Sequence, residues 1–174
     1  MGILDQFRLD GKVAIVTGAA RGLGQGIALG LAEAGADIAA VDVIDQAATA
    51  AEVKKRGRGC VTITADLSKT ADIPRIVETA IKTFGHIDIL FNNAGIIRRA
   101  DLTEFTEKDW DDVININQRT VFFLSQAVAK VFIQQGKGGR IINTASMLSF
   151  QGGIRVPSYT ASKSAIMGLT RLMA

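Results

Sequence analysis

The chain has 174 residues, of which 48% are hydrophobic and 21% charged; this predicts one globular domain over residues 1–174 and excludes a disordered or fibrous chain. Twenty Lys and Arg against 17 Asp and Glu leave a net charge of +3, and the basic residues are scattered, which argues against nucleic acid as a partner. Uncharged stretches such as 141–154 are shorter than the roughly 18 apolar residues of a membrane span.

Short runs rich in valine and isoleucine alternate with longer stretches of helical spacing. We expect buried strands at 12–17, 37–43, 61–65, 87–91 and 140–143. Helices are expected at 24–34, 46–56, 71–84, 107–135 and 157–174. The alternation predicts an α/β fold with a doubly wound parallel sheet, the Rossmann architecture, with helices on both faces.

Local signals agree with several of these helix boundaries. Thr106 followed by Asp109 resembles a capping box that opens the long helix at 107. Gly35, Gly57 and Gly85 stand where the preceding helices should end.

A glycine-rich turn follows the first strand directly. It contains Gly18, Arg21, Gly22, Leu23 and Gly24 and leads into a helix. Glycine permits positive φ and close approach of the backbone to a ligand, and a helix N-terminus attracts a pyrophosphate. The spacing differs from the general dinucleotide fingerprint, so a simple tight turn is the alternative.

Asp42 closes the second strand, where a carboxylate can accept hydrogen bonds from an adenosine ribose and repel a 2′-phosphate. Arg21 favours such a phosphate, but no second basic residue follows the strand. We therefore expect NAD as cofactor, with NADP less favoured. A solvated strand end is the alternative for Asp42.

Small and amide residues follow two other strands at the same sheet edge. Asn93, Ala94 and Gly95 come after the fourth strand and suit a wall beside a flat ring, whereas Asp66 and Leu67 end the third strand and can contact adenine. Asp66 equally fits an ordinary helix cap.

Tyr159 and Lys163 are four residues apart at the start of the last helix, so their side chains share one face. A phenol, with a reference pKa near 10, is a poor acid–base catalyst, but a neighbouring ammonium favours the phenolate. Ser146 is expected at the end of the fifth strand. The pair alone also fits a solvated helix face.

Taken in order, these motifs resemble the short-chain dehydrogenase/reductase family over its amino-terminal two-thirds. They are T-G-A-A-R-G-L-G at 17–24, Asp66-Leu67, N-N-A-G at 92–95, Asn117, Ser146 and Y-T-A-S-K at 159–163. The stretch 145–165, with GHIDIL and EKDWDDV, is similar to the branch that oxidises 2-deoxy-D-gluconate and related keto-deoxy sugar acids.

The resemblance implies an NAD-dependent oxidoreductase acting on a ketone or secondary alcohol of a sugar acid. Tyr159 would be the general acid or base, Ser146 would bind the same substrate oxygen, Lys163 would hold the nicotinamide ribose, and Asn117 would hold a water in the proton relay. The alternatives are a catalytically silent dinucleotide-binding fragment and a general alcohol or 3-oxoacyl reductase of the same family.

A sugar-acid carboxylate needs a cation, and Arg98, Arg99 and Arg155 are the candidates because arginine suits bidentate carboxylate recognition. Gln151 is a candidate for a substrate hydroxyl. Surface arginines without a ligand are the alternative. The sequence offers no metal-ligand cluster.

Family members typically continue beyond this length with two more strands, and their strand order, 3-2-1-4-5-6-7, would leave the fifth strand open at its edge. The last two helices form the main dimer interface in the family, so we expect a homodimer or homotetramer. Apolar residues expected at that interface are Val121, Phe122, Leu124, Val128, Phe132, Ala165, Leu169 and Leu172. Packing on the sheet is the alternative.

One cysteine, Cys60, cannot form an internal disulfide, which predicts a cytoplasmic protein. The charges of Asp5, Arg8 and Asp10 interrupt what would be the apolar centre of a secretion signal.

Overall fold

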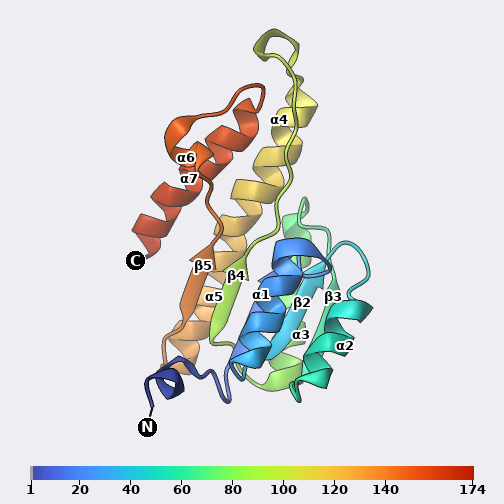
Figure 1. The fold of residues 1–174 in the computed structure, drawn as a ribbon. Coiled ribbons are helices and arrows are strands. Elements are labelled where there is room, and N and C mark those ends of the chain that lie inside the picture. Colours follow the sequence, from blue (N-terminus) through green and yellow to red (C-terminus); the bar gives the residue numbers. More distant parts are fainter. Residues whose placement is uncertain (1) are drawn as a thin grey trace.

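The computed structural model describes residues 2–174 and contains one sheet of five parallel strands (Figure 1). The strand order is β3-β2-β1-β4-β5. The strands are β1 (Val13–Thr17), β2 (Asp37–Asp42), β3 (Cys60–Thr64), β4 (Ile89–Asn92) and β5 (Arg140–Asn143). The doubly wound parallel sheet is thus confirmed, and each strand lies within two residues of its expected bounds.

Helices cover both faces of this sheet. On one face, α1 (Gly22–Glu33) and α2 (Ala47–Lys55) bury alanine and valine side chains against β1 and β2, around Ala28, Ala32 and Val53. On the other, α3 (Ile73–Phe84) and α5 (Thr120–Gln135) form a larger core with Ile76 and Leu124. No helix within residues 2–174 combines the length and apolarity needed to cross a bilayer.

The expected helix 107–135 is continuous, but its hydrogen-bond pattern changes from α-helical to π-helical and back. Thr106 begins it as expected, because its hydroxyl oxygen accepts from the Asp109 N–H at 3.1 Å. An α-helical part, α4 (Glu107–Ile114), passes through a π-helical segment, Asn115–Arg119, into α5. A π-helical turn holds one extra residue within a helix, so hydrophobic periodicity does not reveal it.

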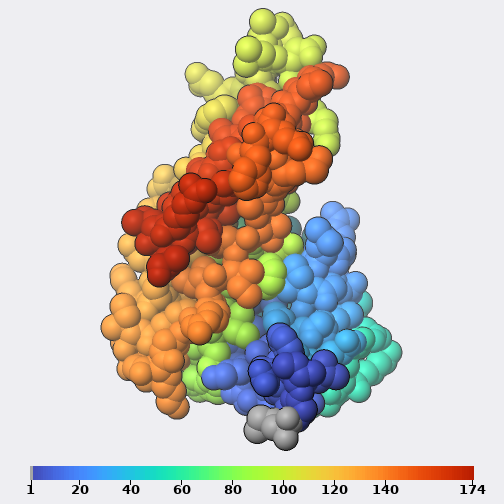
Figure 2. Space-filling view, turned by 60° about the vertical axis from the view of Figure 1, so that its left-hand side comes forward, coloured from blue at the N-terminus to red at the C-terminus, as the bar shows by residue number. Residues whose placement is uncertain are grey.

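Two further helices, α6 (Leu148–Gln151) and α7 (Pro157–Met173), extend beyond the carboxyl ends of the strands; α7 packs against α4, and α6 packs against α7 (Figures 1 and 2). The short α6 was not expected from the sequence. Single 3₁₀ turns complete the described elements, at Ile3–Phe7, Thr70–Asp72 and Leu102–Glu104.

Two side-chain amides on the long helix bind the main chain on either side of β4. Asn117 accepts from Ile96 N at 2.8 Å and donates to Ile96 O at 2.9 Å. Gln135 does the same with Ile87, at 3.0 and 2.8 Å. Each amide thus satisfies both polar groups of one peptide residue and fixes the helix relative to the strand.

Four of the five interface residues expected on α5 do not lie on the surface of the chain, contrary to expectation. Val121, Leu124, Val128 and Phe132 are buried within the chain, the last three of them in the core beneath the sheet. Packing on the sheet therefore explains them, whereas Leu172 on α7 is 73% exposed.

Candidate active site

The glycine-rich turn between β1 and α1 has a backbone that only glycine suits. Gly18 has φ of +69° and Gly22 has φ of +57°. A Cβ atom at Gly24 would lie 1.9 Å from the carbonyl oxygen of Gly18, so a side chain there would break the turn. The turn leaves the N-terminus of α1 open toward the carboxyl edge of the sheet.

Asp42, at the end of β2, is held rigidly by main-chain N–H groups. One carboxylate oxygen accepts from Ala20 N at 3.0 Å, and the other accepts from Val43 N at 2.7 Å and Ile44 N at 3.3 Å. The carboxylate therefore ties the glycine-rich turn to β2 and keeps its charge at the sheet edge.

Two buried polar side chains at the start of α2 bind the glycine-rich turn and the end of β2. Thr49, which is fully buried, donates to Ala19 O at 2.8 Å and accepts from Gln25 Nε2 at 3.0 Å. Gln46, 1% exposed, donates to Asp42 O at 3.1 Å. Sequence reasoning missed both residues, because a threonine or glutamine on a helix gives no local signal of what it binds.

The turn after β4 is fastened to the end of β1. The hydroxyl oxygen of Thr17 accepts from Asn93 N at 3.0 Å and from Ala94 N at 3.1 Å, and the Asn93 side chain donates to Thr17 O at 3.1 Å. A Cβ atom at Gly18 would approach Ala94 Cα to 3.0 Å, so the two turns lie in close contact.

One cavity of about 470 Å³ joins all of these turns. Its lining includes all the expected cofactor-binding residues from the glycine-rich turn to the turn after β4: Gly18, Arg21, Gly22, Leu23, Gly24, Asp42, Asp66, Leu67, Asn93, Ala94 and Gly95. The sequence interpretation did not include Val43, Ala65, Ile96 and Ile116, which also line it. The carboxyl edge of a parallel sheet brings these separate segments together.

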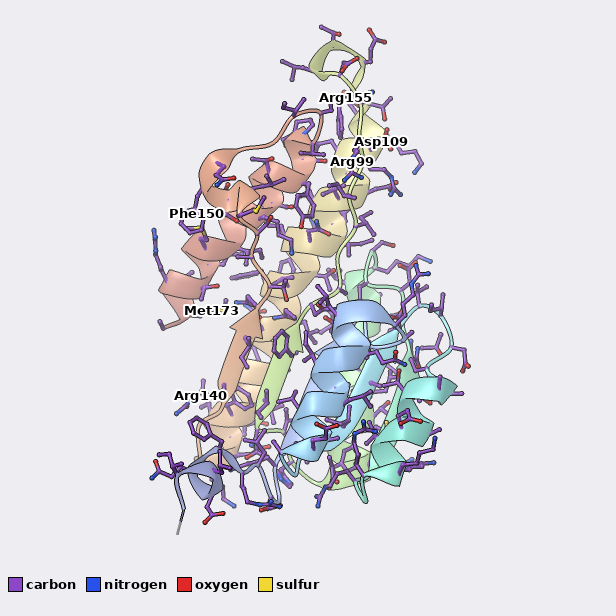
Figure 3. The ribbon with its side chains drawn as sticks, viewed as in Figure 1. Arg99, Asp109, Arg140, Phe150, Arg155 and Met173 are labelled. Carbon is purple, nitrogen blue, oxygen red and sulfur yellow. The ribbon has the colours of Figure 1, made fainter. Side chains whose placement is uncertain are left out.

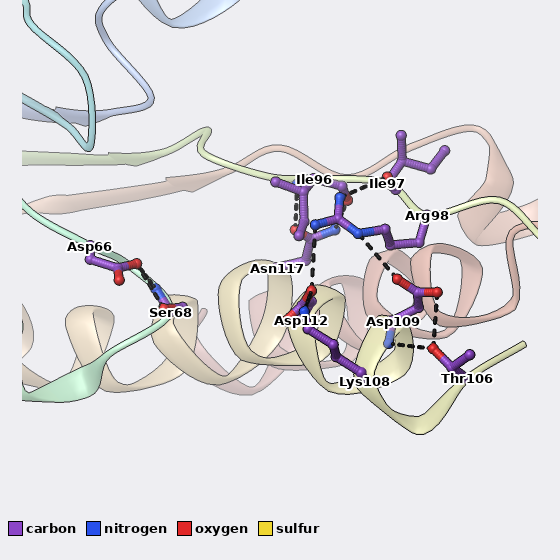
Figure 4. Close-up of polar contacts among 10 residues, drawn as sticks. All are labelled: Asp66, Ser68, Ile96, Ile97, Arg98, Thr106, Lys108, Asp109, Asp112 and Asn117. Carbon is purple, nitrogen blue, oxygen red and sulfur yellow. Dashed lines mark hydrogen bonds and ion pairs between the residues drawn. The ribbon is translucent and has the colours of Figure 1, made fainter.

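Asp66, which lines this cavity, also stabilises the turn that follows it in the chain. Its carboxylate accepts from Ser68 Oγ at 2.7 Å and Ser68 N at 3.0 Å (Figure 4). These bonds hold the pKa of Asp66 below its usual value, and the bond from the Ser68 hydroxyl has the larger effect. The alternative that Asp66 is a helix cap is wrong, because Lys69 and Asp72 stand at the starts of the next 3₁₀ turn and of α3, and Asp66 instead closes the turn before them.

Lys163 is buried beside Tyr159 near the start of α7. Its Nζ atom donates to Thr144 O at 2.6 Å and lies 5.8 Å from the centre of the Tyr159 ring. Lys163 is only 4% exposed, and burial lowers the pKa of its ammonium. The expected shared helix face of the two side chains is confirmed.

Ser146 does not end the fifth strand, contrary to expectation. β5 stops at Asn143, and Ser146 lies three residues later in the turn before α6. Its hydroxyl oxygen accepts from Leu148 N at 3.2 Å, and among the described residues its hydrogen has no acceptor, which leaves it for a ligand.

Ser146 and Tyr159 line a second cavity of about 730 Å³, together with Gly95, Ile96 and Arg98. Gly95 and Ile96 border both cavities. A flat ring entering from the first cavity at this border would therefore meet a group placed against Ser146 and Tyr159.

Asn117 connects the two cavities to α7 through its side chain. Besides its two bonds to Ile96, its amide donates to Ser162 Oγ at 3.3 Å, and Ser162 in turn donates to Tyr159 O at 2.8 Å. Both N–H groups of this side-chain amide are therefore used within the protein.

The candidate substrate cations differ in their surroundings. Arg98 borders the second cavity, but its guanidinium lies 3.4 Å from both Asp109 and Asp112 (Figure 4). Arg155 has a positive φ of 62° and pairs with Asp101 at 3.0 Å. Arg99 and Arg155 lie at the end remote from the strands (Figure 3). Arg99 and Gln151 are exposed and outside both cavities.

This arrangement agrees with the family comparison, in which residues 12–174 match the model of the short chain dehydrogenases. The chain belongs to the short-chain dehydrogenase family.

Among curated proteins, this short-chain dehydrogenase is 62% identical to the 2-dehydro-3-deoxy-D-gluconate 5-dehydrogenase of Escherichia coli K12, over 99% of this chain and 68% of that protein. It spans about two thirds of the length of such relatives. The resemblance to the sugar-acid branch of the family is thereby confirmed.

Two solved structures are similar to this short-chain dehydrogenase. One is that of a 2-deoxy-D-gluconate 3-dehydrogenase from Agrobacterium tumefaciens with bound NADP, so described provisionally; it is 45% identical with a TM-score of 0.88, over 96% of this chain and 66% of that one. The other is carveol dehydrogenase from Mycobacterium avium in complex with NAD, which is 31% identical with a TM-score of 0.91, over 96% and 66%.

Proposed function

We propose that this chain carries the cofactor site and acid–base site of an NAD-dependent oxidoreductase that interconverts a ketone and a secondary alcohol of a sugar acid. The observation that carries the proposal is the meeting of two cavities at Gly95 and Ile96, one with the glycine-rich turn and Asp42, the other with Ser146 and Tyr159.

The residues of the first cavity fit a dinucleotide. The glycine-rich turn admits a pyrophosphate at the N-terminus of α1, where unpaired N–H groups and the helix dipole favour negative charge. Asp42 stands at the end of β2, where an adenosine ribose would lie, and its fixed charge disfavours a 2′-phosphate. Two observations favour NADP instead: Arg21 can pair with a 2′-phosphate, and the structure of the Agrobacterium relative contains NADP. We favour NAD because the charge of Asp42 is held in place.

When bound, the nicotinamide supplies or accepts the hydride. Tyr159 would transfer the proton at the substrate oxygen, and Ser146 would donate a hydrogen bond to that oxygen with its free hydroxyl hydrogen. Lys163, whose ammonium lies beside the Tyr159 ring, would hold the nicotinamide ribose. Asn117 would hold Ile96 and α7 in register, and the family resemblance implies that it also holds a water in the proton relay.

The substrate proposal rests on charge and on the relatives. Arg98 is the candidate cation that borders the second cavity, and Asp109 and Asp112 orient its guanidinium. The 62% identical relative from Escherichia coli is named for a deoxy sugar acid. A carboxylated substrate therefore agrees with both observations.

Assays of the chain with sugar acids and with their neutral amides test this function, using NAD and NADP in parallel. We expect turnover of the acid with NAD, and a loss of at least about a hundredfold in Tyr159→Phe with unchanged NAD binding. Equal rates on acid and amide would favour a general alcohol or 3-oxoacyl reductase. NAD binding without any turnover would favour a catalytically silent fragment.

A further inference from the structure

Ser149, in α6, connects the two segments that carry the candidate catalytic side chains. Its hydroxyl oxygen accepts from Ser146 N at 3.3 Å, and its hydrogen is donated to Lys163 O at 2.8 Å. A serine hydroxyl can make both bonds at once, one as acceptor and one as donor. A single side chain thus links the main chain of Ser146 to that of Lys163.

A return connection closes these bonds into a ring. The Lys163 side chain runs back to Thr144 O, two residues before Ser146, at 2.6 Å. Main chain and side chain of Lys163 are therefore both tied to the segment 144–146, the first through Ser149 and the second directly. Without the Ser149 hydroxyl, the Ser149 N–H would still donate to Ser146 O at 3.0 Å, but the bond from Ser149 to Lys163 O would be lost.

We propose that Ser149 is a positioning residue that fixes Ser146 relative to Lys163 and, one helical turn earlier, Tyr159. The proposal rests on the proposed function of these three residues. Ser146 and Tyr159 must reach the same substrate oxygen, and they come from segments 13 residues apart in the chain. Small errors in such geometry are costly, on the order of a hundredfold in rate for a misplacement of about 1 Å.

Ser164 provides a matched control for Ser149. Its hydroxyl crosses the same contact between α6 and α7 and donates to Ser149 O at 3.3 Å, but this bond does not involve Ser146. Ser149→Ala and Ser164→Ala thus remove the same atom from the two sides of one helix contact.

The first measurement is turnover. We expect Ser149→Ala to lower kcat about tenfold with cofactor affinity unchanged within about twofold, Ser149→Thr to restore most of the loss, and Ser164→Ala to leave kcat unchanged. Equal effects of the two alanine variants on kcat would overturn the proposal. Failure of Tyr159→Phe to affect turnover would instead count against the proposed function.

The second measurement needs no turnover, because the Ser146 N–H donates to Ser149 Oγ at 3.3 Å and its hydrogen exchange reports on that bond. We expect this amide to exchange faster in Ser149→Ala than in the unmodified chain. Ser164→Ala and Ser149→Thr should exchange like the unmodified chain. Equal exchange in all four proteins would contradict the positioning role.

Discussion

The ammonium of Lys163 donates to the main-chain oxygen of Thr144 at 2.6 Å while almost no part of the side chain is exposed. Burial lowers the pKa of Lys163 from its ordinary value of 10.5. Between the lowered value and 10.5, the unfolded chain therefore binds more protons than the folded chain, and the free energy of unfolding gains a contribution that rises with pH.

Lys163→Met should remove that contribution. We expect the difference in unfolding free energy between the unmodified chain and Lys163→Met to move in favour of the unmodified chain as the pH rises toward 10.5. Urea denaturation at a series of pH values measures it. Lys130→Met, on the exposed side of α5, controls for the loss of a lysine side chain outside the site. A constant difference for Lys163→Met would refute the linkage.

Asp42→Asn should shift cofactor preference. The amide removes the negative charge and keeps an oxygen for Val43 N and Ile44 N, although its NH₂ group cannot accept from Ala20 N. The ratio of NADP to NAD affinity should therefore rise by at least about tenfold, or roughly 1.4 kcal/mol. Fluorescence titration with both reduced cofactors measures the ratio. Asp45→Asn, exposed and outside the cavity, should leave it unchanged. An unchanged ratio in Asp42→Asn would remove Asp42 from specificity.

Thr49→Val should weaken dinucleotide binding severalfold without unfolding the chain, because valine keeps the shape but not the hydrogen bond to Ala19 O beneath the glycine-rich turn. Thr49→Ser keeps the hydroxyl and should restore binding. The dissociation constant of NADH is the measurement. Binding that follows side-chain volume rather than the hydroxyl would show that only packing matters.

Arg98→Met should raise the KM for a sugar acid by at least about tenfold and leave the KM for its neutral amide nearly unchanged. Arg99→Met, which alters an exposed residue outside the cavity, should affect neither value. Equal losses on acid and amide would mean that Arg98 acts through its bonds to Asp109 and Asp112 and holds α4 in place.

Cys60 should resist thiol reagents in the folded chain. Burial raises the pKa of its thiol to about 11, so very little thiolate exists at pH 8. Reaction with a coloured disulfide reagent should be slow at that pH and become fast after unfolding in urea. Rapid reaction of the folded chain would contradict this.

The sequence predicted best those parts that rest on local signals. Valine and isoleucine runs indicated the strands, and the glycine turn, Asp42 and the segment 93–95 each follow a strand. Parallel strands share a carboxyl edge, so their grouping in one cavity was predictable.

Features that depend on tertiary partners were not predictable. The periodicity of α5 did not distinguish a sheet-facing surface from a dimer surface, and Val128 and Phe132 proved to lie in the core. The carboxylates beside Arg98, the hydroxyl of Ser149 and the π-helical segment gave no pattern along the chain. The homodimer or homotetramer stays a prediction, which sedimentation at micromolar concentration would test.

The side-chain amides of Asn117 and Gln135 match the length of the long helix between them to the length of the segment that contains β4. They are 18 residues apart and bind Ile96 and Ile87, which are nine residues apart in the opposite direction. Helical and extended rises give about 27 Å and about 30 Å for these two spans. One residue added to the helix between the amides would turn one of them by about 100° and break its pairing, so the number of residues between Asn117 and Gln135 is fixed by these two contacts.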